Sequence, residues 1–284
     1  GVVMSSGDET LPSGSTLGRY RVVRRIGQGG MGVVYEAVHI DLGKRVAIKT
    51  LKPERARDPQ VFARFLREAQ AASRLRHPHV VDVADVSCDE GLAWMVMEHL
   101  EGEDLGALLD RVPRLNAREV ADLIVPVVAA VLAAHEEGIV HRDLKPGNIF
   151  LAKTRHGVIT PKVLDFGISK LLHVDGLDAQ TLTNTTAMVG TPYYMAPEQV
   201  LSSRNASPLS DQYALGVILY RAVTGRLPFR EPEIYPTLHA ITTGLCAPPS
   251  RFAPDLAPPF EALIGRAMAR DPAQRFPSVR ELGA

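Results

Sequence analysis

Residues 24–38 of this 284-residue chain read RRIGQGGMGVVYEAV. This stretch places Gly27, Gly29 and Gly32 in the spacing G-x-G-x-x-G. That spacing occurs in loops that hold a dinucleotide and in loops that cover the phosphates of a nucleoside triphosphate. The residues on either side of the glycines distinguish the two kinds of loop.

The neighbours of the glycines predict strands. A dinucleotide fold needs its glycines at a strand-to-helix turn, with an acidic residue about 20 residues further on. Here VVYEAV follows Gly32, a turn is predicted at 41–44, and a second strand-like run covers 45–51. Residues 49–52 read Lys, Thr, Leu and Lys, without an acid. The pattern therefore excludes a dinucleotide fold and predicts an antiparallel meander, whose glycine hairpin either covers a nucleotide or is an ordinary glycine-rich turn.

Composition limits the partners and the location of the chain. Lys plus Arg equals Asp plus Glu, 32 each, so no overall basic field attracts nucleic acid or anionic lipid. The longest apolar run, 123–134, contains Pro126 and is too short to cross a membrane. We expect a cytoplasmic domain without nucleic acid or membrane contact, either alone or as the cytoplasmic part of a longer membrane-anchored protein. Residues 1–16 are predicted to be a mobile lead-in outside the fold.

Four further motifs follow the glycine loop in a fixed order. They are VAIK ending at Lys49, HRDLKPGN at 141–148, DFG at 165–167 and APE at 196–198. With these motifs the sequence resembles the eukaryotic-type (Hanks-type) protein kinases, in particular the bacterial serine/threonine kinases of that family. The resemblance covers the chain from about Leu17 to the C-terminus.

The resemblance implies an α+β, bilobal protein-kinase-like fold. The small lobe, residues 17–97, is expected to be an antiparallel sheet with one main helix. A hinge at 98–101 leads to a mainly helical large lobe at 102–284, which includes an activation segment at 165–198. ATP is expected in the cleft between the lobes.

The resemblance also assigns catalytic roles to residues at the motifs. Asp143 orients the attacking hydroxyl or accepts its proton, and Lys145 neutralises the transferring phosphoryl group. Asn148 and Asp165 bind Mg²⁺, with Mn²⁺ as an alternative; carboxylate and amide oxygens suit such hard ions. Lys49 holds the α- and β-phosphates of ATP.

Nucleotide contacts are implied at a larger set of positions. Glu68 lies in a segment with apolar residues at helical spacing and is expected to pair with Lys49, although pairing with Arg64 is an alternative. Met97 is expected at the back of the adenine pocket, unless it is plain core, and the backbone of Glu98 and Leu100 is expected to face the adenine. The full predicted set is Ile26, Gly27, Gly29, Gly32, Val34, Ala47, Lys49, Glu68, Met97, Glu98, Leu100 and Phe150.

Two ion-pair positions and two helices are predicted in the large lobe. The resemblance implies that Asp211 braces the catalytic loop and that Glu198 pairs with Arg275. A helix is predicted to begin at the capping pair Asn116 and Glu119 and to end at Gly138. A second, largely buried helix is predicted over 210–225.

The long threonine-rich stretch between the DFG and APE motifs is expected to be a mobile loop that carries regulation. Thr183, Thr185 and Thr186 are candidate phosphorylation sites, and Thr191 is expected to contact the catalytic residues. Arg142 would bind a phosphate on this loop. The position four before Thr191, which is used for activation in many eukaryotic relatives, is Ala187 here. The alternative is a merely polar loop.

Together these features predict a serine/threonine protein kinase that uses MgATP and phosphorylates proteins, first its own activation loop, with a homodimer for autophosphorylation in trans. A pseudokinase that acts as an ATP-responsive scaffold is the alternative, and it usually lacks the motif Lys or one of the Asp residues. A small-molecule phosphotransferase is a further alternative, against which the segment GTPYYMAPEQ, a platform for peptides, argues.

Overall fold

The computed structural model of the chain describes residues 10–28, 32–51, 59–89, 92–154, 156–166 and 192–283, apart from some side chains in the helix at 59–74 and that of Ser203. The contacts among these residues divide the chain into two compact units. Among the described residues, the small unit contains 10–28, 32–51, 59–76, 81–89 and 92–101, and the large unit contains 77–80, 102–154, 156–166 and 192–283. The segment 98–101, predicted as a hinge, belongs to the small unit.

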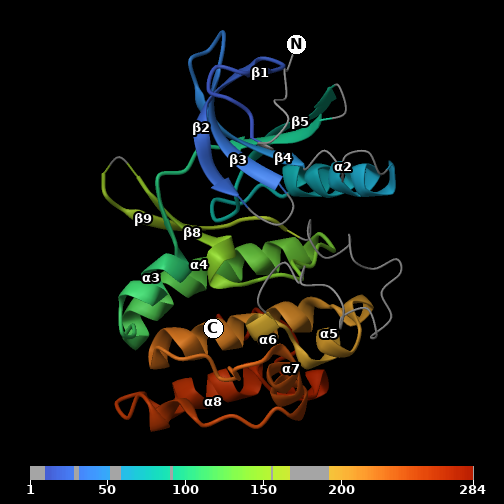
Figure 1. Cartoon of the computed structure of the whole chain (residues 1–284). Helices are drawn as coiled ribbons and strands as arrows, with labels where there is room; N and C mark the ends of the chain where they lie inside the picture. The colour runs from blue at the N-terminus through green and yellow to red at the C-terminus, as the bar shows by residue number, and fades with distance from the viewer. Residues whose placement is uncertain are drawn as a thin grey trace. The chain divides into compact units, whose positions relative to one another are not determined.

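An antiparallel sheet forms most of the small unit (Figure 1). Its strands lie in the order β1-β2-β3-β4-β6-β5. Their bounds are Thr16–Leu17 for β1, Tyr20–Gln28 for β2, Gly32–His39 for β3, Arg45–Leu51 for β4, Val83–Asp89 for β5 and Leu92–Glu98 for β6. The sequential pairing of β2, β3 and β4 confirms the predicted meander, and Gly43, with φ +64°, makes the turn between β3 and β4.

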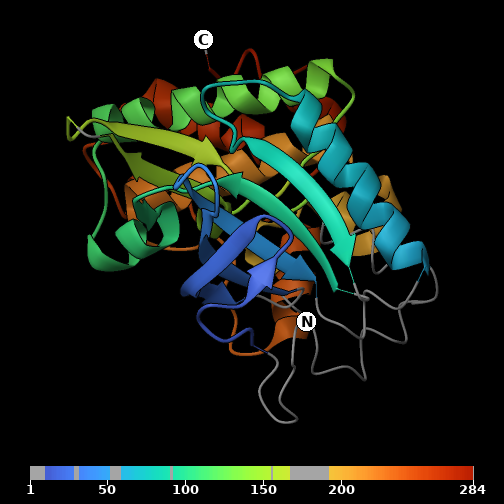
Figure 2. The same ribbon diagram turned by 90° about the horizontal axis from the view of Figure 1, so that it is seen from above.

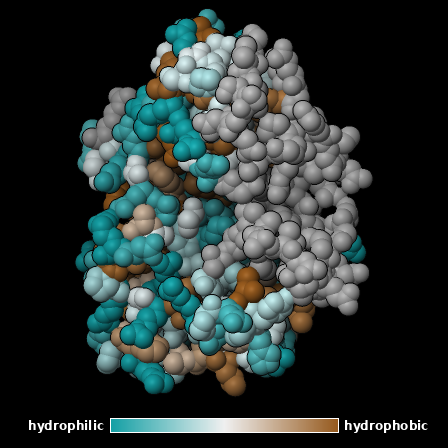
Figure 3. All heavy atoms as spheres, in the orientation of Figure 1, coloured by the Kyte–Doolittle hydropathy of each residue, from teal (hydrophilic) through white to brown (hydrophobic). Residues whose placement is uncertain are grey.

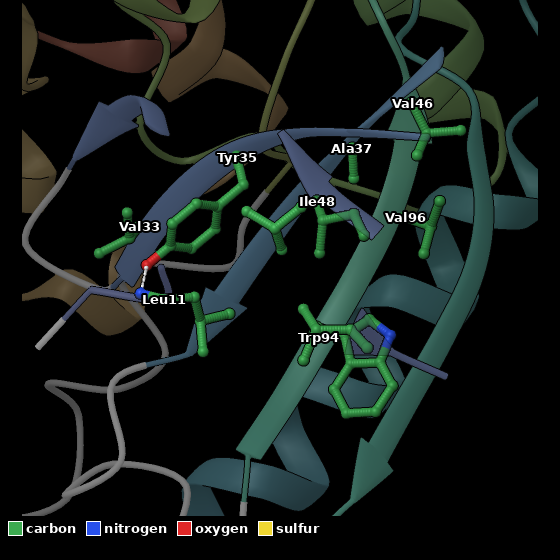
Figure 4. Close-up of a cluster of buried hydrophobic side chains, with 10 residues drawn as sticks. Leu11, Val33, Tyr35, Ala37, Val46, Ile48, Trp94 and Val96 are labelled. Carbon is green, nitrogen blue, oxygen red and sulfur yellow. Dashed lines mark hydrogen bonds between the residues drawn. The ribbon is translucent and has the colours of Figure 1, made fainter. Parts of the chain in front are cut away.

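The two faces of this sheet carry different residues because side chains alternate along each strand. On one face, apolar side chains from β3, β4 and β6 form a cluster that includes Tyr35, Ile48 and Trp94 (Figure 4). Val34, Ala47 and Lys49 alternate with the cluster residues and therefore belong to the opposite face. The sheet thus has a core face and a face that presents Lys49.

Part of the expected lead-in, residues 11–16, contributes to the small unit, whereas residues 1–9 lie outside the described part of the chain. Leu11 is buried, and its N–H donates to the Tyr35 hydroxyl over 2.8 Å (Figure 4). The N–H of Gly14 donates to the carbonyl of Val22, whose own N–H donates to the carbonyl of Ser15. One apolar side chain in a polar stretch is a weak sequence signal, but Leu11 removes apolar surface from water here.

Helix α2, Pro59–Arg74, supplies the predicted helix of the small unit. Phe65, Ala69 and Ala72 are buried and recur at helical spacing, as the sequence predicted. The helix packs against β5, and the views in Figures 1 and 2 show it running beside that strand.

Helices are the main regular elements in the described part of the large unit. Their bounds are Leu105–Arg111 for α3, Ala117–Glu136 for α4, Pro197–Leu201 for α5, Pro208–Thr224 for α6, Ile234–Thr243 for α7 and Pro258–Ala267 for α8. The capping box of α4 between Asn116 and Glu119 is present, and Gly138 follows the helix with φ +74°, so both predicted helix ends are confirmed. Helix α6 is buried almost throughout and packs against α4 and α8, which makes it the centre of the large unit.

A small antiparallel sheet positions the loop that carries the HRDLKPGN motif. It consists of β7, Gly102–Asp104, β8, Ile149–Lys153, and β9, Ile159–Val163, in that order. Strand β9 packs against α4. The segment 137–148 therefore joins helix α4 to the central strand of this sheet, and both of its ends are fixed.

The surface of the described residues is mainly hydrophilic on the face shown in Figure 3, with hydrophobic residues in small patches. Among the helices in the described part of the chain, none is both long enough and apolar enough to span a membrane.

Two glycines of the large unit, Gly225 and Gly138, give a matched test of the packing. Both have φ near +70°, but a Cβ on Gly225 would lie 2.0 Å from the carbonyl oxygen of Pro113, whereas one on Gly138 would meet nothing within 4 Å. We expect Gly138→Ala to lower the free energy of unfolding by about 1 kcal/mol through backbone strain. Gly225→Ala should cost about 2 kcal/mol more through overpacking. Urea denaturation of both variants measures the difference, and equal costs would contradict this packing.

Candidate active site

The loop between α4 and β8 is held by one buried carboxylate. Asp211, in the first turn of α6, is 1% exposed. One of its oxygens accepts the N–H of His141 and the other that of Arg142, each over 2.8 Å. Nε2 of His135, at the end of α4, lies 2.8 Å from the first of these oxygens. Three partners compensate for the burial of this charge, so the predicted bracing of the loop by Asp211 is present.

This bracing holds the backbone in a strained conformation. Arg142 and Asp165 are the only residues other than glycine with positive φ in the part of the chain that the structure describes, at +67° and +52°. Such a conformation costs about 1–2 kcal/mol per residue. At Arg142 the N–H is bound by Asp211, and the carbonyl accepts a hydrogen bond of 3.0 Å from Nε2 of Gln199. Strain of this kind is concentrated at functional sites, where the surroundings enforce it.

His141 connects the loop to the segment after β9. It is fully buried, its Nε2 lies 2.8 Å from the carbonyl oxygen of Leu164, and its Nδ1 accepts the N–H of Asp143 over 3.3 Å. Since a carbonyl can only accept, Nε2 carries the proton and the ring is the neutral tautomer. The ring also contacts that of Phe166, with centroids 4.9 Å apart. Both side chains are therefore packed inside the large unit.

The polar side chains of the HRDLKPGN motif converge on Asp143. The ammonium nitrogen of Lys145 lies 2.8 Å from one Asp143 carboxylate oxygen. The Asn148 side-chain amide donates to the Asp143 carbonyl over 2.8 Å and, at 3.5 Å, approaches the same carboxylate oxygen. The side chains of Asp143 and Lys145 are 20% and 29% exposed. A carboxylate with a fixed orientation thus remains accessible from the surface of the large unit.

Asp165 and Asn148 lie at neighbouring strand ends. Asn148 immediately precedes β8, Asp165 follows β9 by two residues, and the two strands pair through Ile149 and Val163. The N–H of Leu164 donates to the carbonyl of Asn148 over 2.8 Å. Because Asn148 uses its amide nitrogen toward Asp143, its Oδ1 is the atom that can coordinate a cation.

The Asn148 Oδ1 and the Asp165 carboxylate are oxygen donors that suit a hard divalent cation. Magnesium is usually bound by one or two protein oxygens, with waters and substrate phosphates completing its shell. Within the described ranges no group of three or more His, Cys, Asp or Glu residues could hold a metal ion. Asn148 and Asp165 thus offer two oxygen donors of the kind that magnesium takes from proteins.

A second buried ion pair anchors the start of α5. Arg275, with a fully buried side chain, donates from its two terminal nitrogens to the two carboxylate oxygens of Glu198 over 2.8 and 2.9 Å. Further guanidinium hydrogen bonds reach the carbonyls of Leu209 and Ala269. The predicted Glu198–Arg275 pair is thus present in a bidentate geometry, which is the strong form of an arginine–carboxylate contact.

The small unit presents its predicted site residues on the face opposite the core cluster. Lys49 pairs in register with Val34 on β3 and with Met95 on β6, and Ala47 pairs with Met97. Met97 is buried and Ile26 is 40% exposed. Packing in the sheet requires a glycine at position 32, because a Cβ there would lie 1.7 Å from the carbonyl oxygen of Thr50.

Several predicted residues lie outside the described part of the chain. They are Gly29, the side chain of Glu68, Gly167, and the loop residues Thr183, Thr185, Thr186, Ala187 and Thr191. Two polar residues that help to hold the loop between α4 and β8, His135 and Gln199, were not predicted. The only signal for His135 is a titratable residue at the end of an apolar helical run, and Gln199 offers none beyond its place after the APE motif.

Comparison with known proteins identifies the family. The protein kinase domain family matches residues 20–282. Serine/threonine-protein kinase PknA of Mycobacterium tuberculosis is 41% identical over 92% of the chain, and Pkn1 of Myxococcus xanthus is 40% identical over 94%. A crystal structure of the Mycobacterium tuberculosis PknI kinase domain superposes with a TM-score of 0.73 at 32% identity, over 96% of each chain.

The chain therefore belongs to the protein kinase domain family, and the predicted fold is confirmed. Membership of this family implies ATP and a divalent metal. The chain spans 59% of the length of PknA and 37% of that of Pkn1.

Substitutions at the Glu198–Arg275 pair measure the free-energy cost of leaving a buried carboxylate without its charged partner. Arg275→Met leaves the Glu198 carboxylate without its charged partner and should lower the free energy of unfolding by about 3–5 kcal/mol. In the Glu198→Gln background, Arg275→Met should lower the free energy of unfolding by about 2 kcal/mol less, because it then leaves no buried charge without a partner. Chemical denaturation of the parent, both single variants and the double variant measures this coupling; additive costs would contradict it.

The same pair predicts a dependence of stability on pH. Burial by itself raises the pKa of Glu198, but hydrogen bonds from Arg275 and Ser210 and the charge of Arg275 outweigh it, so the pKa lies below its ordinary value of 4.5. The stabilisation is therefore complete above about pH 5 and is lost as the pH falls through the folded-state pKa. The difference in unfolding free energy between the parent and Glu198→Gln should be constant near neutrality and shrink below pH 4.5. A difference unchanged in acid would refute this assignment.

Proposed function

We propose that this chain is the catalytic domain of a serine/threonine protein kinase, which transfers the γ-phosphoryl group of MgATP to serine or threonine hydroxyls of proteins. The observation that carries the proposal is the fixed, accessible Asp143 carboxylate beside Lys145 and Asn148. Relatives named serine/threonine-protein kinases support the substrate class.

Asp143 acts on the attacking hydroxyl. In the reaction, the hydroxyl oxygen forms a bond to the γ-phosphorus, the bond from that phosphorus to the bridging oxygen of ADP breaks, and the hydroxyl proton passes to the carboxylate. Lys145 donates to the Asp143 carboxylate and Asn148 donates to the Asp143 backbone carbonyl, and together these bonds hold the residue in place. Positioning supplies much of the catalysis in phosphoryl transfer.

Lys145 has a second role toward the phosphoryl group. Its ammonium, partly exposed beside Asp143, neutralises charge on the transferring oxygens. Asn148 through Oδ1 and Asp165 through its carboxylate are the residues that hold Mg²⁺, with Mn²⁺ as a substitute. The bound metal supplies charge neutralisation at the phosphate oxygens.

The small unit supplies residues for the nucleotide. Lys49 holds the α- and β-phosphates and pairs with Glu68, while the backbone of Gly27, Gly29 and Gly32 covers the phosphates. The adenine ring is held by apolar contacts and by backbone groups of the segment after β6. The residues proposed for these contacts are Ile26, Val34, Ala47, Met97, Glu98, Leu100 and, from the large unit, Phe150.

Regulation is proposed to act through the threonine-rich segment between Asp165 and Glu198. Phosphate on Thr183, Thr185 or Thr186, added in trans within a homodimer, would pair with the guanidinium of Arg142. Thr191 would contact Asp143 and Lys145 and favour serine and threonine substrates. The domain is proposed to work in the cytoplasm, where ATP is supplied.

Intact-mass measurements test the proposed reaction. Phosphatase-treated protein incubated with MgATP should gain mass in steps of one phosphate, and the phosphate should map to residues 183–186. Asp143→Asn should slow this gain at least about 100-fold, because the carboxylate is lost as base and orienting group. Asp255→Asn, which changes an exposed aspartate paired with Arg114, is the matched control and should behave like the parent.

Other outcomes would separate the alternatives. If the parent gains no mass but phosphorylates a generic protein substrate, the kinase activity stands and loop autophosphorylation is refuted. If it transfers no phosphate to any protein yet binds MgATP, the chain is a pseudokinase scaffold.

A further inference from the structure

One carboxylate of the small unit occupies an unexpected position. Glu36 lies in the middle of β3, and its side chain is only 8% exposed. Its neighbours Tyr35 and Ala37 point into the core cluster, so Glu36 belongs to the face that presents Lys49. A charge this deeply buried needs partners of opposite charge.

Two arginines supply those partners. The Nε and a terminal nitrogen of Arg45 lie 2.9 and 2.8 Å from Oε1 of Glu36. A terminal nitrogen of Arg24 lies 2.8 Å from the other oxygen, Oε2. Burial by itself raises the pKa of Glu36, but the hydrogen bond from Arg45 and the charges of Arg45 and Arg24 lower it overall. Glu36 is therefore an anion at neutral pH.

Arg45 also binds the segment that follows β6. Its other terminal nitrogen lies 2.7 Å from Oε1 of Glu101, and the nitrogen that faces Glu36 is 3.5 Å from Nε2 of His99. His99, with a side chain 10% exposed, lies 4.0 Å from Glu36 itself. We call Arg24, Glu36, Arg45, His99 and Glu101 the Glu36 cluster. It joins the middle of β3 to residues 98–101.

The Glu36 cluster lies on the same sheet face as the proposed nucleotide residues. Arg45, Ala47 and Lys49 alternate with the core residues of β4, and Glu36 pairs in register with Ala47, which pairs with Met97. At a strand rise of about 3.3 Å per residue, Arg45 is about 13 Å along β4 from Lys49. If Lys49 holds phosphates, the cluster stands at the other end of the nucleotide, beside residues 98–101.

Stability alone does not explain this arrangement. Exposed ion pairs contribute little, and the side chains of Arg45 and Glu101 are 48% and 66% exposed. A buried ion pair is often no more stabilising than apolar residues of the same size. What the Glu36 cluster adds is a fixed position for the chain after β6.

We infer that Glu36 and Arg45 are positioning residues, which hold the backbone of residues 98–101 for the adenine ring of ATP. The inference rests on the proposed function. Glu36 acts chiefly through Arg45, which contacts the segment at Glu101 and His99, since the approach of Glu36 itself to His99 is longer, at 4.0 Å.

Steady-state kinetics test this inference. Glu36→Gln and Arg45→Met should each raise the KM for ATP about fivefold, with kcat within about twofold of the parent, because the binding surface moves while the reacting groups do not. In the Arg45→Met background, Glu36→Gln should add less than about twofold. Arg24→Gln is the matched control: it removes a partner of Glu36 but no contact to residues 98–101, and its KM should match that of the parent.

Hydrogen exchange of the nucleotide-free protein gives a second readout that does not require activity. Glu36→Gln and Arg45→Met should speed the exchange of the amides at 98–101 about tenfold, while amides of 46–48 in the sheet exchange as in the parent. Faster exchange throughout the sheet would indicate a merely structural role and overturn the inference, as would an unchanged KM together with unchanged exchange at 98–101. A parent that transfers no phosphate refutes the proposed function, and the exchange at 98–101 then decides the inference alone.

Discussion

The buried carboxylate of Asp211 is the interaction on which the rest of the candidate site depends. It lies in the most buried helix of the large unit and accepts two consecutive backbone N–H groups of the loop between α4 and β8. Because a buried charge without partners is costly, the folded large unit requires the loop in this conformation. The same contacts compensate for the left-handed backbone of Arg142, which an unsupported loop would relax.

The loop held by Asp211 is connected by further side chains to two other segments of the chain. His141 links the loop to the carbonyl of Leu164 and to the Phe166 ring, and Gln199 links it to the segment after the APE motif. Glu198, the last residue of that motif, is in turn fixed by Arg275. Buried side chains thus act as supports, while Asp143 and Lys145, which carry the proposed chemistry, stay partly exposed. A reactive group gains precision when its supporting residues are packed and fully hydrogen-bonded.

The small unit separates support and function across the two faces of one sheet. The core face buries Tyr35, Ile48 and Trp94, and the N-terminal segment covers part of it through Leu11. The opposite face presents Lys49 at one end of β4 and the Glu36 cluster at the other. Buried charges again mark the places where separate segments meet, as Asp211 does in the large unit.

Local structure and family membership could both be predicted from the amino-acid sequence. The meander follows from strand-like runs and a Gly43 turn, the ends of α4 from its capping residues, and the motif residues from their order along the chain. Tertiary structure decided which distant polar atoms meet: Gln199 with the Arg142 carbonyl 57 residues away, His135 with Asp211, Arg45 with Glu101, and Leu11 with Tyr35. The physical reason is that periodicity and caps depend on neighbours within a few residues, and these a sequence displays directly. The partner of a buried polar group, in contrast, is chosen by the packing of whole elements, which brings together residues that no local pattern connects.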